Sequence, residues 1–340
     1  MVPLTVRSHY SLMWGTSSVR RLCRAARRMG YTRLALTDTD NLYGLWPFLA
    51  ACRREGLTPI VGAEVTDPVG RGRAVCLVAN ATGYGNLCRL LTARHMAGAF
   101  SLATALPDRA EGLVVLTGTP DLLERWHAAG VRVAAALPRR PLPASHPLRQ
   151  IARRNRLPVV ATPGSFFLDP GEHATHRLLR AIDRKTSLDR LAAQDVAPAD
   201  AWLAPPDRYR QRFATCPEVI AATHDLAEEL TFTGPAFGLV MPPWPAKGGP
   251  KPPPDDALRR AAYRGARRRY GRELPETVVD RLEHELQVIA RMGFSTYFLV
   301  VRDIVRPSSR TCGRGSGAAS LVAYCLGSDI WVMWGYTLAF

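Results

Sequence analysis

The segment Gly313-Arg314-Gly315-Ser316 has the residue types and the spacing of a turn that holds a phosphate group. Glycines let backbone N–H groups approach an anion closely, and the guanidinium of Arg314 adds a planar fork of donors for phosphate oxygens. Ser316 can cap the helix predicted by the residues that follow, and the positive end of that helix would face the same anion. A structural turn before a helix can have the same composition, so these four residues alone leave both interpretations open.

The elements that must position this turn are predicted from the residues before it. Apolar spacing predicts helices over residues 257–270 and 275–292, and an apolar segment, residues 297–304, leads into the turn. The first helix is strongly basic, and we take Arg264, Arg267 and Arg268 as its candidate contacts to DNA. A solvated helix face is the alternative interpretation of the same charges.

The net charge indicates a polyanionic partner. The chain has 340 residues, 47% of them hydrophobic, which suits about two domains with hydrophobic cores. Lysine and arginine number 45 against 29 aspartates and glutamates, a formal net charge of +16. Only three of the basic residues are lysines, and arginine binds phosphate bidentately, so nucleic acid is one explanation. An arginine-rich composition that reflects GC-rich coding is the other.

The cysteine and hydropathy patterns argue against several classes of protein. The seven cysteines occur singly, without a Cys-x-x-Cys pair, which argues against a zinc ribbon and against a secreted disulfide framework. The N-terminus lacks the regions of a secretion signal, and no apolar run reaches membrane-spanning length. We therefore expect a cytoplasmic protein with no membrane partner.

Strand-like and helix-like segments alternate over residues 1–235. Apolar runs of strand length lie at residues 4–6, 34–36, 59–65, 74–78, 112–116, 131–137 and 158–161. Amphipathic stretches lie between most of them, such as residues 19–29, with Ser17 or Ser18 as the N-cap and Gly30 at the C-terminal end. The alternation predicts an α/β fold with parallel strands, either an open sheet or a closed barrel. A proline-rich stretch, residues 236–256, predicts a semi-rigid linker to the remaining residues, 257–340.

Three stretches carry a resemblance to a known family: residues 7–12 with 34–44 and 59–64, residues 281–304, and the Gly-Arg-Gly-Ser segment. Together they resemble the bacterial C-family replicative polymerase, the DNA polymerase III alpha subunit, especially its error-prone variants. The first stretch resembles the opening of the family's PHP domain, which is a distorted (β/α) barrel. The last one lies in the family's palm and helps to bind the triphosphate of the incoming nucleotide. The likeness, which covers roughly residues 3–327, implies a PHP domain at 1–235 and a mostly helical, partial palm at 257–340.

The resemblance also shows that most metal-binding positions of the PHP domain are replaced in this sequence. Some relatives hold a metal cluster with two histidines spaced His-x-His near the N-terminus, and those places read Thr5 and Arg7 here. Further ligand positions of the family fall on Arg73, Thr119, Gly164 and Phe166. Only Asp38 and Glu64, with Asp40 nearby, remain as ligand types. Carboxylates without imidazole hold a multinuclear transition-metal site poorly, and Arg7 and Arg73 would add positive charge, so we expect no functional metal centre.

The histidines of the chain do not replace the missing ligands. His9 is shifted two places from the family motif. His173 and His176 are spaced i, i+3 on a predicted helix without a matching pair nearby. We expect each of them to be a surface or partly buried polar residue and not a metal ligand.

The palm of the family carries three aspartates that hold two Mg²⁺ ions for nucleotidyl transfer. Two of them are expected several dozen residues beyond Ser316, but the likeness stops near Gly327, and the tail offers only Asp329. We therefore expect no catalytic residue here and interpret the chain as the N-terminal portion of an error-prone DNA polymerase III alpha subunit, a DNA-directed DNA polymerase by family that is inactive alone. Mg²⁺ is expected for the intact polymerase. Its implied partners are primer–template DNA, dNTPs, other polymerase segments and replisome subunits.

Two alternative functions remain. A stand-alone PHP phosphoesterase would bind Mn²⁺ or Zn²⁺ and hydrolyse a phosphomonoester, although the lost ligands argue against it. A non-catalytic scaffold would bind DNA or protein, and the basic helix would add non-specific affinity for DNA.

Overall fold

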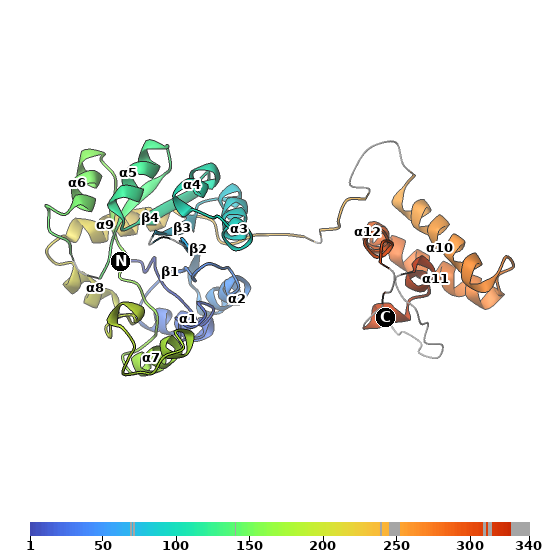
Figure 1. The fold of residues 1–340 in the computed structure, drawn as a ribbon, viewed down its shortest axis with the longest axis horizontal. Coiled ribbons are helices and arrows are strands. Elements are labelled where there is room, and N and C mark those ends of the chain that lie inside the picture. The colour runs from blue at the N-terminus through green and yellow to red at the C-terminus, as the bar shows by residue number, and fades with distance from the viewer. Residues whose placement is uncertain are drawn as a thin grey trace. The chain divides into compact units, whose positions relative to one another are not determined.

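The computed structural model describes residues 1–68, 70, 72–139, 141–238, 240–244, 252–308, 311 and 315–327, with only the backbone of Ser316 and Ala318. The chain divides into two compact units, Met1–Pro235 and Ala236–Phe340 (Figure 1). Each unit has a hydrophobic core of its own.

The described part of the first unit is built around a curled sheet of six strands that follow one another in sequence order. The strands are β1 (Arg33–Leu36), β2 (Thr58–Thr66), β3 (Arg73–Val78), β4 (Leu113–Thr117), β5 (Val133–Leu137) and β6 (Val159–Ala161). The pairs β1–β2, β4–β5 and β5–β6 are parallel, whereas β3 is antiparallel to both of its neighbours. The predicted strands after the first are thus confirmed, in a sheet that is mixed and not purely parallel.

The predicted strand at residues 4–6 is wrong, because this segment forms no continuous ladder with either neighbour. Val6 makes an isolated bridge to Ser165, which follows β6. The Thr37 N–H donates to Val6 O (2.8 Å) on one side, and the Arg7 N–H donates to Ser165 O (2.9 Å) on the other. The N-terminal segment therefore links the two edges of the curled sheet, since β1 ends just before Thr37.

Helices surround the sheet in the first unit (Figure 1). They are α1 (Val19–Arg28), α2 (Leu45–Glu55), α3 (Ala81–Met96), α4 (Leu102–Ala105), α5 (Pro120–Ala128), α6 (Pro147–Arg154), α7 (Glu172–Asp183), α8 (Pro206–Arg212) and α9 (Pro217–Glu229), with short 3₁₀ turns at Pro107–Arg109 and Ala193–Asp195. Helix α1 confirms the prediction over residues 19–29. Ser18 is its N-cap and accepts from the Arg21 N–H at 3.4 Å, and Gly30 follows it with φ 85°, a conformation that favours glycine.

The strands bury both of their faces, because successive side chains of a strand point to opposite sides of the sheet. Leu34 and Leu36 belong to an outer cluster that packs against the helices, whereas Ala35 belongs to an inner cluster. Helix α9 fills part of the inner cluster with Leu226, and the residue after its end, Leu230, does the same. This two-sided burial explains why the strands read as nearly continuous apolar runs in the sequence.

The described part of the second unit is helical. It contains α10 (Pro254–Tyr270), α11 (Glu276–Arg291), α12 (Ser295–Val305), a 3₁₀ turn (Ser316–Ala319) and α13 (Leu321–Leu326). Helix α10 begins three residues earlier than predicted, because proline is tolerated in the first turn of a helix, where its missing N–H has no partner to lose. The apolar segment at 297–304 lies within α12 and contributes Leu299 to the core.

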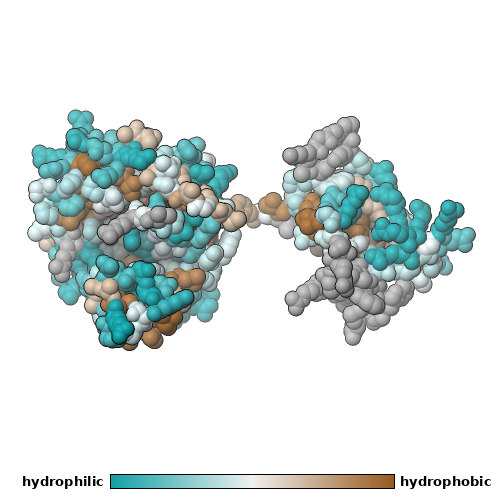
Figure 2. Space-filling model, viewed as in Figure 1, coloured by the Kyte–Doolittle hydropathy of each residue, from teal (hydrophilic) through white to brown (hydrophobic). Residues whose placement is uncertain are grey.

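The surface of the first unit is mainly hydrophilic in the view of Figure 2, with apolar side chains gathered near α7. Leu178 and Ile182 on α7 are about half exposed, as is Leu188 after it. Among the described residues, no helix is long and apolar enough to cross a membrane.

Candidate functional site

The carboxylate of Glu64 in the first unit forms an ion pair with an arginine. Glu64 lies on β2 and is 4% exposed. Arg7 Nε and NH2 donate to its two oxygens at 3.2 and 2.6 Å, and the Thr39 hydroxyl donates at 3.0 Å. Arg73 NH1 lies 3.7 Å from Oε1. Burial alone would raise the pKa of Glu64, but the charges of Arg7 and Arg73, with the hydrogen bonds, hold that pKa below its ordinary value.

The other two candidate ligands, Asp38 and Asp40, are also engaged by neighbouring groups. Asp38 is 2% exposed and accepts from the Ser8 N–H (2.7 Å) and from the hydroxyls of Ser8 (2.8 Å) and Ser11 (2.7 Å). Burial raises the pKa of Asp38 although these hydrogen bonds oppose the shift. Asp40 has φ 58°, accepts from the Thr66 N–H and hydroxyl, and pairs with Arg94 at 3.0 Å. Each carboxylate is therefore a structural acceptor in this fold.

The positions that the resemblance matched to metal ligands do meet in space. A cavity of about 480 Å³ is lined by Thr5, Arg7, Glu64, Arg73, Thr119, Gly164 and Phe166, among other residues. The residues present do not fit a metal cluster, because the guanidinium of Arg7 is bonded to the carboxylate that a cation would need. Within the described ranges, no three His, Cys, Asp or Glu side chains form a group that could hold a metal ion.

The histidines have structural environments. His176 is fully buried, which corrects the expectation of a surface or partly buried residue. Its Nδ1 is 2.7 Å from Trp14 O, and its Nε2 accepts from the Ala197 N–H at 2.9 Å. Burial lowers the pKa of His176, so the neutral ring is favoured. His173 contacts Ala197 O at 3.1 Å, and His9 is exposed.

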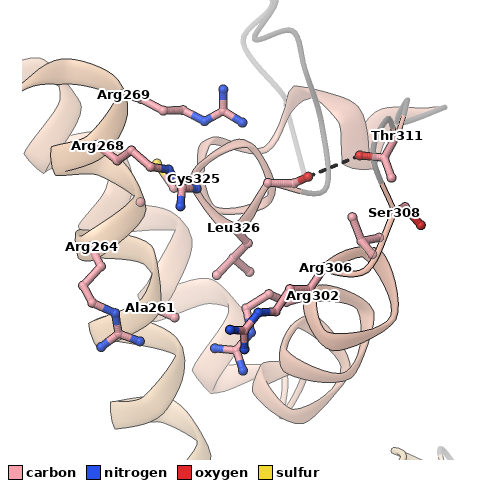
Figure 3. Close-up of a pocket in the computed structure, with 13 residues that line it drawn as sticks. Ala261, Arg264, Arg268, Arg269, Arg302, Arg306, Ser308, Thr311, Cys325 and Leu326 are labelled. Atoms are coloured by element: carbon pink, nitrogen blue, oxygen red, sulfur yellow. Dashed lines mark hydrogen bonds between the residues drawn. The ribbon is translucent and has the colours of Figure 1, made fainter.

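A second cavity, of about 630 Å³, lies in the second unit and is strongly basic (Figure 3). Five of the described residues that line it are arginines: Arg264, Arg268 and Arg269 from α10, and Arg302 and Arg306 from the end of α12. No aspartate or glutamate is among its described lining residues. Arg302 pairs with Asp303 outside the lining, whereas Arg264, Arg268 and Arg306 have no ion pair within the described part of the chain. Three guanidiniums without a described ion pair, in a cavity with no described lining carboxylate, favour an anion.

Helix spacing and close packing build this cavity. Arg264 and Arg268 are four residues apart, as are Arg302 and Arg306, so each pair shares one face of its helix, and both pairs are among the lining residues drawn in Figure 3. Gly265, between the first pair, lets α10 touch α13, because a Cβ there would lie 1.8 Å from Cys325 O. Burial raises the pKa of the Cys325 thiol to about 11, so it stays protonated and is no nucleophile.

The three candidate DNA contacts on α10 separate into two groups. Arg264 and Arg268 line the cavity, but Arg267 does not. The guanidinium of Arg267 is instead 5.9 Å from the ring centre of Tyr263, and its side chain is exposed.

The Gly-Arg-Gly-Ser turn is only partly within the described residues, and Gly313, Arg314 and Asp329 lie outside them. Gly315 has φ 73°, which favours glycine. Ser316 begins a 3₁₀ turn and not an α-helix, so its predicted role as the cap of the following helix is wrong. That role belongs to Ser320, whose hydroxyl accepts from the Ala323 N–H at 3.2 Å.

The N-terminus of α13 already holds an anionic group, Glu285 of α11. The Glu285 carboxylate accepts from the backbone N–H groups of Leu321 (3.1 Å) and Val322 (3.0 Å) and from the Ser320 hydroxyl (2.8 Å). Arg281 also donates to it at 2.7 Å. The start of this helix is therefore occupied by a carboxylate, which corrects the expectation that it would face a phosphate group.

Comparisons with known proteins follow this two-part organisation. Residues 3–129 match the family model of the PHP domain, and residues 256–330 match that of the bacterial DNA polymerase III alpha NTPase domain. The error-prone DNA polymerase of Symbiobacterium thermophilum is 33% identical over 371 residues, which cover 96% of this chain and 34% of that protein. The chain is homologous to the N-terminal third of the DNA polymerase III alpha and error-prone DNA polymerase family.

Another curated relative agrees with this assignment. The DNA polymerase III subunit alpha of Bacillus subtilis is 30% identical, over 96% of this chain and 32% of that one. The chain thus spans about a third of the length of these curated relatives. Among solved structures, an amidohydrolase from Chromobacterium violaceum with bound sulfate and no metal matches 49% of this chain and 87% of its own, with 21% identity and a TM-score of 0.34.

Sequence reasoning missed residues that line both cavities, and also Glu285, which lines neither. Arg302 lies within the apolar segment 297–304 and Arg306 lies just after it. Their i, i+4 spacing repeats that of Arg264 and Arg268. Glu285 was not singled out, because its contacts with α13 lie 35 to 37 residues away in the chain. His146, which lines the cavity of the first unit, had no recognisable motif around it.

Proposed function

We propose that this chain supplies the PHP domain (residues 1–235), a proline-rich linker (236–256) and the beginning of the palm (257–340) of an error-prone DNA polymerase of the DNA polymerase III alpha type. The family homology supports this assignment. The remaining segments of a polymerase or other replisome subunits would be its protein partners, and primer–template DNA its nucleic acid.

Within the second unit, we infer that the arginine-lined cavity and the Gly313–Ser316 turn hold the triphosphate of a dNTP. The observation that carries this inference is the cavity itself, where three arginines have no ion pair among the described residues and no lining carboxylate opposes an anion. Residues 312–314 lie outside the described structure. In the chain they follow Thr311, which lines the cavity, and precede Gly315, which is the described end of the turn. Arg314 would add a further phosphate contact.

The same cavity does not fit the Mg²⁺ ions of a polymerase. Its described lining contains five arginines, the hydroxyls of Ser308 and Thr311 and no carboxylate, whereas Mg²⁺ is usually bound through one or two carboxylates. A polypeptide of residues 1–340 is therefore expected to bind a nucleotide without incorporating it. Primer extension with Mg²⁺ and dNTPs checks this directly, and measurable extension by the purified polypeptide would contradict it.

Nucleotide binding is tested by hydrogen–deuterium exchange, which reports on α10 and α12 separately from the rest of the chain. Adding dATP should protect both helices. The double variant R264A/R268A should raise the dATP concentration needed for half-protection about tenfold or more, because charge-assisted contacts contribute about 1.5–3 kcal/mol each. The matched variant R267A, which removes an exposed arginine outside the cavity, should change it less than twofold. An equal effect of both variants would mean that only the general charge of the helix matters.

The role of α10 in DNA binding is a separate proposal, tested with primer–template DNA at several salt concentrations. Each lost phosphate contact should reduce the slope of log affinity against log salt by about 1. Replacing Arg264, Arg267 and Arg268 one at a time assigns the contacts. Unchanged slopes in all three variants would mean that these arginines face solvent and do not contact DNA.

A further inference from the structure

We propose that the cavity of the first unit binds an oxyanion, a phosphate or a small phosphate monoester, through Arg7, Arg73 and His146. This cavity is where the PHP resemblance implies metal cations, so the replacements have inverted the charge of the ligand that the site accepts. The inference goes beyond the proposed function and concerns a different unit of the chain.

The first observation is a buried donor without a partner. Arg7 is 5% exposed, and its Nε and NH2 are both used by Glu64. Its NH1 is buried and makes no hydrogen bond to any described residue. An unpaired charged donor in a buried position is costly, on the order of 1–3 kcal/mol or more. A ligand oxygen in the cavity, which Arg7 lines, would satisfy it.

A glycine leaves space beside this buried donor. Gly164 lines the cavity with φ 61°, and a Cβ built on it would contact Arg7 NH1 at 3.7 Å and Phe166 at the same distance. Any larger side chain at this position would cover NH1. The ring of Phe166 lies under the guanidinium, 4.4 Å from its central carbon, and supports the arginine from the side.

Arg73 supplies a second set of donors, at the exposed side of the cavity. Its side chain is 61% exposed and its NH1 is 3.7 Å from Glu64 Oε1, which is too long for a hydrogen bond. Its donors are therefore available to a ligand. Arg139, which also lines the cavity, serves a different purpose, because it donates to Asp200 and to the carbonyls of Pro163 and Gly164.

His146 adds a neutral donor from the N-terminus of α6. Its Nδ1 accepts from the Leu148 N–H at 3.3 Å, so Nδ1 carries no proton and Nε2 carries it. Nε2 makes no hydrogen bond in the described part of the chain and, as His146 lines the cavity, can donate to a ligand oxygen. The N-terminus of α6 contributes favourable partial charge to the same anion.

The charges around the cavity decide between an anion and a cation. Glu64 is the only carboxylate among its described lining residues, and both its oxygens already accept hydrogen bonds. Arg7, Arg73 and Arg139 outnumber it. A volume of about 480 Å³ lies within the range of small-molecule sites, so a phosphate monoester the size of a mononucleotide fits.

The test measures binding of inorganic phosphate by calorimetry, at constant ionic strength, to the whole chain carrying R264A/R268A, which removes two of the competing arginines of the second unit. We expect saturable binding of one phosphate. Adding R73A should weaken it about fivefold or more. Adding R154A instead should change it less than twofold, because Arg154 is equally exposed (64%) and paired with an acid, Glu124, but lies outside the cavity.

Other arms of the experiment identify the ligand group and the donor. AMP should bind at least as tightly as phosphate, whereas adenosine, which lacks the phosphate, should not bind. R7K keeps one positive charge beside Glu64 but loses the planar set of guanidinium donors. It should weaken phosphate binding about fivefold or more.

The proposal is overturned if phosphate does not bind the R264A/R268A chain, if R73A and R154A have equal effects, or if adenosine binds as tightly as AMP. Stoichiometric Mn²⁺ binding that is lost in E64Q would also overturn it, because the site would then still take a cation. Each of these results leaves dATP protection of α10 and α12 unaffected, so the two proposals fail independently.

Discussion

Arginines line a cavity in each unit of this chain, but the two sets have different surroundings. In the first unit, Arg7 forms a bidentate pair with Glu64 and Arg139 binds Asp200. In the second, Arg264 and Arg268 extend into a cavity with no carboxylate among its described lining residues. The same residue type thus forms buried or half-buried ion pairs beside one cavity and lines the other without a lining carboxylate.

The difference shows that the burial and the partner of an arginine determine its role. A buried guanidinium needs a carboxylate, because an isolated buried charge is very unfavourable. Arg7 is 5% exposed and has one, whereas Arg264 and Arg268 are exposed and remain solvated without a partner. A solvated guanidinium can exchange water for phosphate, so the arginines of the second cavity can bind and release a ligand. The Arg7–Glu64 pair, in contrast, is part of the fold.

The largest expected effect comes from breaking the buried pair. R7M should lower the free energy of unfolding of the first unit by about 3–5 kcal/mol, because buried Glu64 would lose its bidentate partner and keep only Arg73, 3.7 Å away, as a nearby positive charge. Urea unfolding followed by hydrogen exchange in β2 and β3 measures it. R73A, which removes an arginine that is 61% exposed, should cost less than about 1 kcal/mol.

The double variant R7M/E64L separates the pair from its packing. It should recover most of the stability lost in R7M, since no buried charge is left. If R7M alone costs less than about 1 kcal/mol, the pair is not structural, and the contrast with the second cavity fails.

The second cavity depends on backbone contact and not on ion pairs. G265A should destabilise the second unit by about 1–3 kcal/mol or more, because the new methyl group would clash with the backbone of Cys325 (1.8 Å from its carbonyl oxygen). It should also weaken dATP binding by separating α10 from α13. Hydrogen exchange in α10 measures the stability.

G317A is the matched control for this prediction. A Cβ at Gly317 would meet nothing within 4 Å in the described structure, so the stability of the second unit should change by less than about 0.5 kcal/mol. Equal stability of G265A and G317A would show that α10 and α13 do not touch as described.

Glu285 holds the N-terminus of α13 in the second unit. E285Q should cost about 1–2 kcal/mol, because an amide keeps one acceptor oxygen where Glu285 now accepts four hydrogen bonds, from Arg281, Ser320, Leu321 and Val322. Hydrogen exchange in α13 should rise. E276Q, at an exposed position of α11, should leave it unchanged, and a similar loss in both variants would contradict this role of Glu285.

The sequence predicted the fold better than it predicted the sites. Strand and helix periodicity located β1 to β6 and α1, because each element buries a regular set of apolar residues. It did not identify α12 as a helix, since a short run of apolar residues has no clear period. Residues 4–6 were wrongly predicted as a strand, because apolar content does not show whether a segment pairs continuously with one neighbour.

Contacts between distant residues were the main limit for the sites. The resemblance placed Arg7 and Arg73 among the former ligand positions, and the structure brings both to Glu64, 57 residues from Arg7 in sequence. The contacts of Glu285 with the start of α13 depend on how α11 packs, which no local pattern encodes. Ser316 satisfied the local rule for a cap, but the helix began five residues later, at Leu321.

The smallest expected effect concerns pH and compares the two cavities directly. In the wild-type chain the pKa of Glu64 lies below its ordinary value of 4.5, so its ionised form stabilises the fold above that pH, and this contribution is lost as the pH falls through the lowered pKa. In R7M, which leaves Arg73 as the only charge described beside Glu64, the pKa of Glu64 should be higher than in the wild type, and protonation should relieve the buried charge as the pH falls. The difference in the free energy of unfolding between wild type and R7M should therefore shrink as the pH falls. The decrease is about 1.4 kcal/mol for each pH unit that lies between the two pKa values of Glu64 and within the range measured. Urea unfolding of the first unit at pH 7 and at pH values below 4.5 measures this change. The matched difference for R264A/R268A in the second unit should stay constant over the same range, because no described carboxylate lines that cavity, and a parallel decrease there would show that the arginines of both units are paired with acids.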